Sequence, residues 1–225
     1  MTETRGPRRG LFDAWSRVYD FPLVQQATYR PVHDAVLRKL VARSGVRAVL
    51  DLGCGTGQLL RRIAETFPSS RPVGCDYSGG MLAEASARVR DASWTAASDG
   101  ATHATPALVR GDAMRLPFHD ATFDAIVSTE AFHWFPDHDA AIAEIARVLM
   151  PNGVLLLGFV NPPLGLVSEA VHVASRLFGA PLRWPTATAL RGKLARGGFD
   201  VVSQRRIFRI PGFLVPPVLT EARKR

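Results

Sequence analysis

Residues 49–58 read VLDLGCGTGQ, a short apolar strand pattern followed by glycine at positions 53, 55 and 57. Glycine lets the backbone turn tightly and come close to a ligand, because it has no Cβ. The helix expected from Gln58 onward offers its free N-terminal amide groups to a carboxylate or a phosphate. This stretch therefore predicts a strand, a ligand-binding loop and a helix in succession.

The glycine spacing does not match a dinucleotide-binding loop. That fingerprint is G-x-G-x-x-G, and its last position falls on Gln58 when counted from Gly53, or on Leu60 when counted from Gly55. Asp51, near the end of the expected strand, would repel a pyrophosphate but suits a ligand that carries an ammonium group. An NAD-dependent dehydrogenase is therefore disfavoured.

Strand and helix patterns alternate along the rest of the chain. The expected strands are residues 46–52, 71–76, 107–110, 123–128, 153–160, 199–209 and 213–221, and the expected helices are residues 58–67, 78–90, 138–150, 167–178 and 186–196. Residues 11–43 are mostly helical in pattern, and residues 91–107 are expected to form a long, mobile surface loop. This alternation predicts an α/β fold with a parallel sheet that helices cover on both faces.

Two further acids end the next two strands. Asp76, in the motif GCDYS, is placed to accept hydrogen bonds from both hydroxyls of a ribose. Asp112, in GDAMRLPF, is placed to accept from an adenine amine, with Ala113 and Met114 along the ring. Each acid alone is most simply a helix cap or a turn residue. Three acids at the ends of three successive strands, behind a glycine loop, indicate a common ligand site.

Five motifs in this order resemble those of the class I S-adenosylmethionine (SAM)-dependent methyltransferases. They are VLDLGCGTG, GCDYS, GDAMRLPF, FDAIVS and ARVLMPNG, within residues 46–160, and they are most similar to the small-molecule branch that includes the ubiquinone/menaquinone methylases, methyltransferase type 11. The resemblance implies a Rossmann-like, seven-stranded, mostly parallel sheet whose last strand is antiparallel. Asn152 replaces a usual glycine, but asparagine also tolerates left-handed geometry.

The resemblance also implies an N-terminal helical lid segment at residues 1–43, a methyltransferase domain at residues 44–225, and S-adenosyl-L-methionine as cofactor. The candidate cofactor-binding residues are Asp51, Gly53, Cys54, Gly55, Thr56, Gly57, Asp76, Tyr77, Met81, Asp112, Ala113, Met114, Ser128 and Thr129.

The candidate catalytic residues are His133, Glu130 and Tyr19. Methyl transfer from a sulfonium needs in-line placement of the nucleophile, and a base is needed only if the nucleophile starts protonated. His133 is a candidate general base because its unperturbed pKa is near neutrality, although it could merely start a helix and pack. Tyr19 lies in LFDAWSRVYD, which resembles a lid of the quinone-methylase branch; alternatively its aromatic neighbours only dock the first helix.

Several aromatic residues in the second half of the chain favour a planar or lipophilic acceptor. The residues concerned are Phe132, Trp134, Phe135, Trp184 and Phe213. The predicted function is therefore methyl transfer to a small, aromatic or lipophilic acceptor, and the sequence leaves open whether O, N or C is methylated.

Composition sets the remaining bounds. A chain of 225 residues with 47% hydrophobic content can bury one substantial core. No apolar run reaches the roughly 18–20 residues that span a bilayer, and no secretory signal pattern is present, so the expected location is cytoplasmic.

Cys54 and Cys75 lack metal-ligand spacing with histidine, so no metal is expected. The net charge of +8 leaves peripheral membrane contact open, and the oligomeric state is not readable.

Two alternative functions are retained: a nucleic-acid methyltransferase and a non-catalytic SAM-binding regulatory protein. The run Asn161-Pro162-Pro163 is typical of base-amino methylases, but there it follows the fourth strand, whereas here it follows the fifth. We therefore predict that it ends that strand, because proline cannot donate to a ladder, and a place in the outer wall of the substrate pocket stays open to it. A nucleic-acid acceptor is disfavoured, also because no extra recognition domain fits in the chain.

Overall fold

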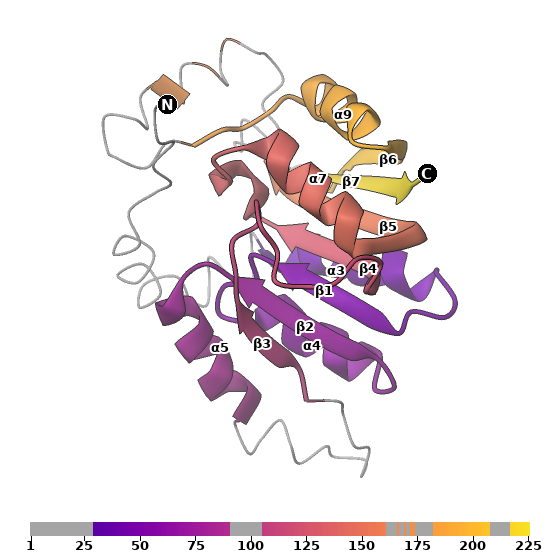
Figure 1. The fold of residues 1–225 in the computed structure, drawn as a ribbon. Coiled ribbons are helices and arrows are strands. Elements are labelled where there is room, and N and C mark those ends of the chain that lie inside the picture. Colours follow the sequence, from indigo (N-terminus) through magenta and orange to yellow (C-terminus); the bar gives the residue numbers. More distant parts are fainter. Residues whose placement is uncertain are drawn as a thin grey trace.

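A computed structural model describes residues 29–90, 105–160, 166, 169, 172–173, 182–207 and 217–225 of the chain. Within them a seven-stranded sheet is covered by helices (Figure 1). The strands are β1 (Ala48–Leu52), β2 (Arg71–Asp76), β3 (Ala107–Arg110), β4 (Phe123–Thr129), β5 (Leu149–Val160), β6 (Phe199–Arg206) and β7 (Pro217–Lys224). The helices are α3 (Arg30–Val41), α4 (Gln58–Thr66), α5 (Gly79–Arg90), η2 (Phe132–Trp134, a 3₁₀ turn), α7 (His138–Val148) and α9 (Ala187–Arg196).

The sheet has the strand order β3-β2-β1-β4-β5-β7-β6. β1 pairs in parallel with β2 and β4, and β4 pairs in parallel with β5. β7 runs antiparallel to both of its neighbours, β5 and β6. The predicted Rossmann-like fold, with an antiparallel last strand, is confirmed. The strand order reverses between β1 and β4, and their carboxyl ends are where this fold class binds ligands.

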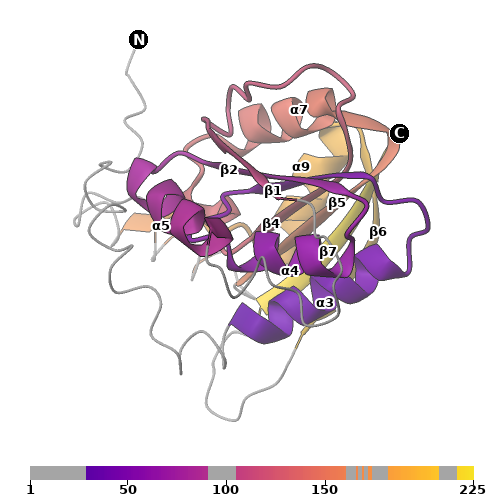
Figure 2. The ribbon, with the colours of Figure 1, turned by 90° about the horizontal axis from the view of Figure 1, so that it is seen from below.

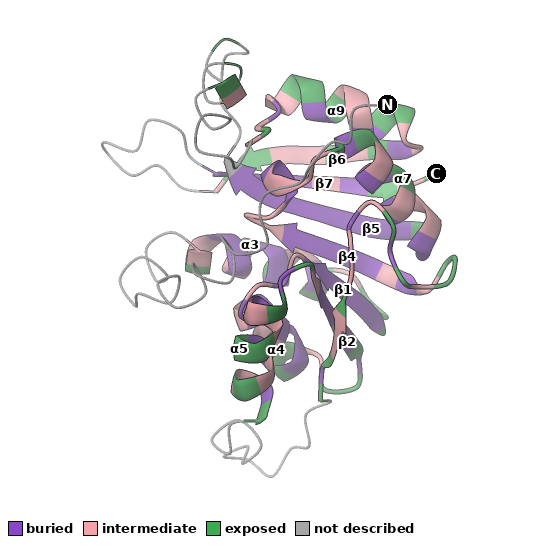
Figure 3. Ribbon diagram, turned by 60° about the vertical axis from the view of Figure 1, so that its left-hand side comes forward, coloured by how far each residue is buried: buried purple, intermediate pink, exposed green. Residues whose placement is uncertain are grey.

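The central strands are apolar because helices bury them on both faces. All five residues of β1 are buried, and Leu155, Leu156 and Leu157 in the middle of β5 are fully buried. Figure 3 shows the same burial across β1, β4 and β5. A near-continuous apolar run, without alternation, is typical of a parallel strand covered on both sides.

The molecule has three layers, with the sheet in the middle (Figure 2). α7 and α9 pack on one face, where Ile142, Ile145 and Leu190 join the larger apolar core. α3 and α4 pack on the other face, where Leu40 and Ile63 join a second core. None of the described helices is both long and apolar enough to cross a membrane.

Several boundaries differ from those expected, for local reasons. β5 begins at Leu149, not at residue 153, and its pairing with β4 shifts register between Phe123 and Ala125. The additional residues of β5 at this shift lie around Asn152. Its φ is +60°, so Asn152 adopts the left-handed backbone conformation that asparagine was predicted to tolerate. β7 ends at Lys224, three residues beyond the expected end at residue 221, and its expected start at residue 213 lies outside the described residues.

Some expectations lie outside the described residues. They concern Tyr19 and its aromatic neighbours, residues 91–104 of the expected loop, the run Asn161-Pro162-Pro163, most of the expected helix at 167–178, and Phe213.

Candidate functional site

The three glycines of the loop after β1 all adopt the left-handed conformation that favours glycine. Their φ angles are +73° at Gly53, +53° at Gly55 and +78° at Gly57. Most residues other than glycine and asparagine enter this region only with strain. Gly57 is also the N-cap residue of α4. The alternate glycines therefore define the path of the loop.

Two of these glycines also lie against another segment. A Cβ on Gly53 would be 2.3 Å from the Cβ of Ala131, and a Cβ on Gly57 would be 3.1 Å from the Cβ of Ala85. A Cβ on Gly55 would meet no atom within 4 Å. Gly55 therefore presents an open backbone face at the carboxyl end of β1, where a ligand can approach closely.

The end of β2 holds the glycine loop in place. The amides of Gly53 and Cys54 both donate to the carbonyl oxygen of Cys75, at 2.7 and 3.2 Å. The Asp76 carboxylate accepts from the amide of Gly55 at 2.9 Å and from that of Ser78 at 2.8 Å. Asp76 therefore joins the loop to the start of α5, and its half-buried carboxylate faces the same edge of the sheet.

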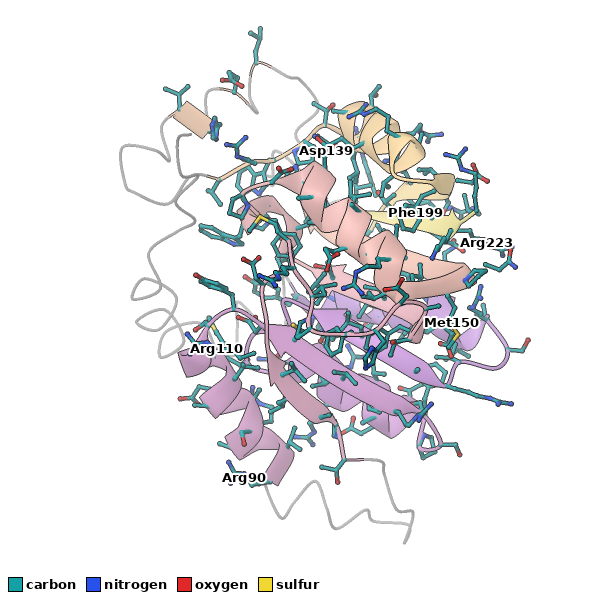
Figure 4. The ribbon with its side chains drawn as sticks, viewed as in Figure 1. Arg90, Arg110, Asp139, Met150, Phe199 and Arg223 are labelled. Atoms are coloured by element: carbon teal, nitrogen blue, oxygen red, sulfur yellow. The ribbon has the colours of Figure 1, made fainter. Side chains whose placement is uncertain are left out.

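The end of β3 forms the next part of this edge. Asp112 accepts a hydrogen bond from the amide of Met114 at 2.9 Å, which fixes a tight turn, and Ala113 is buried in it. Arg110, labelled in Figure 4, donates from Nε to the carbonyl oxygen of Tyr77 at 3.3 Å. β2 and β3 are adjacent, so Asp76 and Asp112 end neighbouring strands, as the sequence predicted.

Asp51 is buried at the centre of the site, with 1% of its surface exposed. Its carboxylate oxygen Oδ2 has no hydrogen-bond partner among the described residues. Burial, and then the nearby charge of Asp76, raise the pKa of Asp51 to about 8. A buried polar oxygen without a partner is costly, and a ligand cation would relieve that cost.

A small cavity of ≈ 40 Å³ opens at Asp51. Its lining residues are Tyr29, His33, Asp51, Gly53, Cys54, Gly55, Thr56, Gln58, Leu59 and Thr129. Tyr29 and His33 were not predicted as site residues. A signal for His33 was present, because this polar residue lies at helical spacing from Val36, Leu37 and Leu40, on the apolar face of α3.

The end of β4 forms the other side of the cavity. Thr129 lines it, whereas Ser128 is fully buried and its Oγ has no hydrogen-bond partner among the described residues. Glu130 has a φ of +51°, which is unusual for a residue with a side chain, and its amide donates to the carbonyl oxygen of Gly158 at 2.8 Å. Such strained residues are frequent at functional sites.

His133 lies in η2, within an aromatic group. Its ring centroid is 5.4 Å from those of Trp134 and Trp184 and 6.3 Å from that of Phe159. Burial, and then the neighbouring His138, lower the pKa of His133 to about 3. The ring is therefore neutral and weakly basic at neutral pH, which counts against its expected role as general base.

Three further candidate residues are buried, two in the glycine loop and one in α5. The Cys54 thiol is buried, and burial raises its pKa well above the ordinary value. Thr56 is buried in the loop, and its carbonyl oxygen accepts from Arg88 of α5. Met81 is buried, and its amide donates to Ser78 Oγ at 3.2 Å. Among the described residues there is no cluster of three or more potential metal ligands.

The side chains and backbone groups of this site match the chemical groups of SAM. The open face of Gly55 admits a ligand close to the backbone, and the unpartnered Oδ2 of Asp51 suits an ammonium group. Asp76 and Asp112, on the next two strands, offer acceptors for hydroxyl and amine donors. Together with the strand order, this arrangement defines a class I SAM-dependent methyltransferase.

Comparison with known proteins gives the same class of protein. Residues 50–157 match the family described as "Methyltransferase domain". The demethylmenaquinone methyltransferase of Thermus thermophilus is 30% identical over 182 residues, which are 72% of this chain and 78% of that protein. The malonyl-[acyl-carrier protein] O-methyltransferase of Geobacter sulfurreducens is 31% identical over 203 residues, which are 86% of this chain and 70% of that protein.

A solved structure is also similar: a methyltransferase of Haloferax volcanii in complex with the Trm112 methyltransferase activator. It has a TM-score of 0.70 and 25% identity, covering 94% of this chain and 96% of that one. The chain belongs to the class I SAM-dependent methyltransferases, in the branch that acts on small molecules.

Proposed function

We propose that this protein transfers the methyl group of SAM to a small, aromatic or lipophilic acceptor by in-line displacement. The contact between Gly53 and Ala131 supports this most directly. It sets the glycine loop against the residue that immediately precedes η2, whose Phe132 and His133 pack among aromatic rings. An acceptor bound at this aromatic group would therefore lie next to the cofactor site.

The named acceptors of the relatives differ, since one protein is named for demethylmenaquinone and the other for malonyl-[acyl-carrier protein]. The acceptor class is therefore proposed from the side chains of this chain. Phe132, Phe135 and Phe159 lie with ring centroids 5.5 Å apart in two pairs, centred on Phe132. Phe132 and Phe159 are fully buried, whereas Trp134, Phe135 and Trp184 are partly exposed. Partly exposed aromatic rings of this kind bind flat or apolar groups.

When bound, SAM supplies an electrophilic methyl group that needs only a well-placed nucleophile. We propose that Asp76 holds the ribose, that Asp112, Ala113 and Met114 hold the adenine, and that Asp51 and Thr129 face the methionine end. Tyr77 and Met81 complete this set beside α5. The protein then contributes mainly position, because the reacting groups are held in line.

Glu130 is the acceptor-side group that we propose for catalysis, together with Tyr19, and we propose that His133 shapes the acceptor site. Glu130 follows the cavity-lining Thr129, and its left-handed backbone fixes where the side chain leaves the strand. The lowered pKa of His133 favours a role in shaping the acceptor site over proton removal.

A labelled-methyl transfer screen over phenols, quinols, amines and nucleic acids tests the proposal. We expect label on small aromatic or lipophilic compounds, and none with an Asp76→Ala variant. Label on DNA or RNA alone, with salt-sensitive binding, would show a nucleic-acid methyltransferase. Calorimetric binding of S-adenosylhomocysteine (SAH) without any transfer would show a non-catalytic regulator. We further propose a cytoplasmic location.

A further inference from the structure

We propose that His33 is a positioning residue for the amino-acid end of SAM, where its ring binds the ligand carboxylate while Asp51 binds the ammonium group. This inference rests on the proposed function, and it adds a residue from α3, the helix that precedes β1. Its basis is the cavity that His33 and Asp51 share.

The strand order fixes which end of the ligand lies at this cavity. Asp112, Asp76 and Asp51 lie at or near the ends of β3, β2 and β1, which are consecutive neighbours in the sheet. If Asp112 faces the adenine and Asp76 the ribose, the part of SAM beyond the ribose lies at β1. The cavity there has a volume of ≈ 40 Å³, which suits two small polar groups but not a ring.

The loop itself has few donors left for a carboxylate. The amides of Gly53 and Cys54 donate to Cys75, that of Gly55 donates to Asp76, and that of Gly57 donates to the carbonyl oxygen of Cys54 at 2.9 Å. A carboxylate at the cavity therefore needs a donor from outside these four amides. α3 brings the side chain of His33 to the cavity wall.

His33 has the properties of such a donor. It is 7% exposed and lines the cavity, and its ring forms no hydrogen bond with another described residue. Burial, and then the charge of Arg62, lower the pKa of His33 to about 4. At neutral pH the ring is thus neutral and carries one N–H donor. A hydrogen bond from it to a carboxylate would be charge-assisted, and therefore stronger than a neutral pair.

Two ligands that differ only at the amino-acid end test the inference. SAH carries the ammonium and carboxylate groups, whereas 5′-methylthioadenosine lacks both. Dissociation constants for each are measured by calorimetry with the whole chain and with three variants. His33→Leu removes the donor, His33→Gln retains one, and His119→Leu changes an exposed histidine that does not line the cavity.

We expect His33→Leu to weaken SAH binding about tenfold or more, as for the loss of a hydrogen bond to a charged group. Binding of 5′-methylthioadenosine should change less than about twofold on the same scale, which also shows that the variant is folded. His33→Gln should recover part of the SAH affinity, and His119→Leu should bind both ligands like the original chain.

Equal weakening of both ligands by His33→Leu would overturn the inference, because it would reduce His33 to a packing role. Unchanged SAH binding would overturn it as well, while leaving the proposed function intact. If the original chain bound neither ligand, the SAM site itself would be wrong, and the proposed function would fail together with the inference.

Discussion

Gly53 and Ala131 are in such close contact that a Cβ on Gly53 would lie only 2.3 Å from the Cβ of Ala131. The contact joins the loop after β1 to the end of β4, two segments that are far apart in the sequence. Gly55, two residues further on, has a similar backbone but no atom near its absent side chain. Glycine is therefore needed at position 53 for packing against Ala131, whereas at position 55 it leaves space for a ligand.

Gly53→Ala should lower the free energy of unfolding more than Gly55→Ala, because it adds a clash with the Cβ of Ala131 to the strain of a positive φ. For Gly55→Ala we expect a cost of about 1–2 kcal/mol from the left-handed conformation alone, together with a marked loss of SAH binding. Urea unfolding and calorimetry measure the two effects. Equal destabilisation by both substitutions would contradict the importance of the contact with Ala131.

Asp76→Asn should weaken SAH binding by about tenfold or more, because the carboxylate accepts from the Gly55 and Ser78 amides and is the proposed ribose acceptor. Calorimetry measures the change. Asp200→Asn is a matched control, since Asp200 is an exposed acid of β6 with an ion pair to Arg225 at 3.7 Å. If both variants bound SAH equally well, Asp76 would not be a cofactor residue.

His133→Phe should leave turnover at pH 7 within about threefold of the original rate, because a ring with a pKa of about 3 contributes little as a base. Phenylalanine keeps an aromatic ring among Trp134, Trp184 and Phe159. Steady-state rates with an acceptor from the methyl-transfer screen check this. A loss of roughly 10²–10⁴-fold would instead establish His133 as the general base.

Acid should destabilise the protein through its buried histidines. The pKa is lowered to about 3 in His133 and to about 4 in His33 and His138. Each therefore contributes stability that is present above pH 6.5, the unfolded value, and is lost as the pH falls toward the folded value. His133→Phe should reduce the slope of unfolding free energy near pH 5 by up to about 1.4 kcal/mol per pH unit.

Urea midpoints between pH 4 and pH 7.5 measure that slope, with the exposed His119→Phe as control. The control should retain the slope of the original chain. An unchanged slope in His133→Phe would mean that this ring is not kept neutral by burial.

Asp51 should lower the free energy of unfolding as the pH rises, whereas the buried histidines lower it as the pH falls. Its pKa is raised to about 8 in the folded state, above the ordinary value of 3.8, so its contribution is fully present below pH 3.8 and is lost as the pH rises through about 8. Between pH 5 and pH 8 the original chain should lose stability relative to Asp51→Asn. Urea midpoints of the two proteins over this range check the prediction, and parallel curves would contradict it.

Much of the fold was predictable because its signals are local. The buried apolar run of β1, the glycines that require positive φ, and the acids near successive strand ends are properties of short segments. Asn152 was likewise predicted to tolerate a left-handed backbone, and it adopts one. The start of β5 and the end of β7 were misplaced, because pairing with neighbouring strands decides where those strands begin and end.

Local sequence patterns were enough to predict the succession of strands and helices, the conformation of the glycine loop and the sheet edge at which the acids gather. Those features follow from side-chain periodicity and from backbone conformations that only certain residues adopt. Two features became visible only in the folded chain: His33 shares a cavity with Asp51, and His133 is buried deeply enough to be a weak base. Both depend on how distant segments pack and exclude water, and no single segment encodes that.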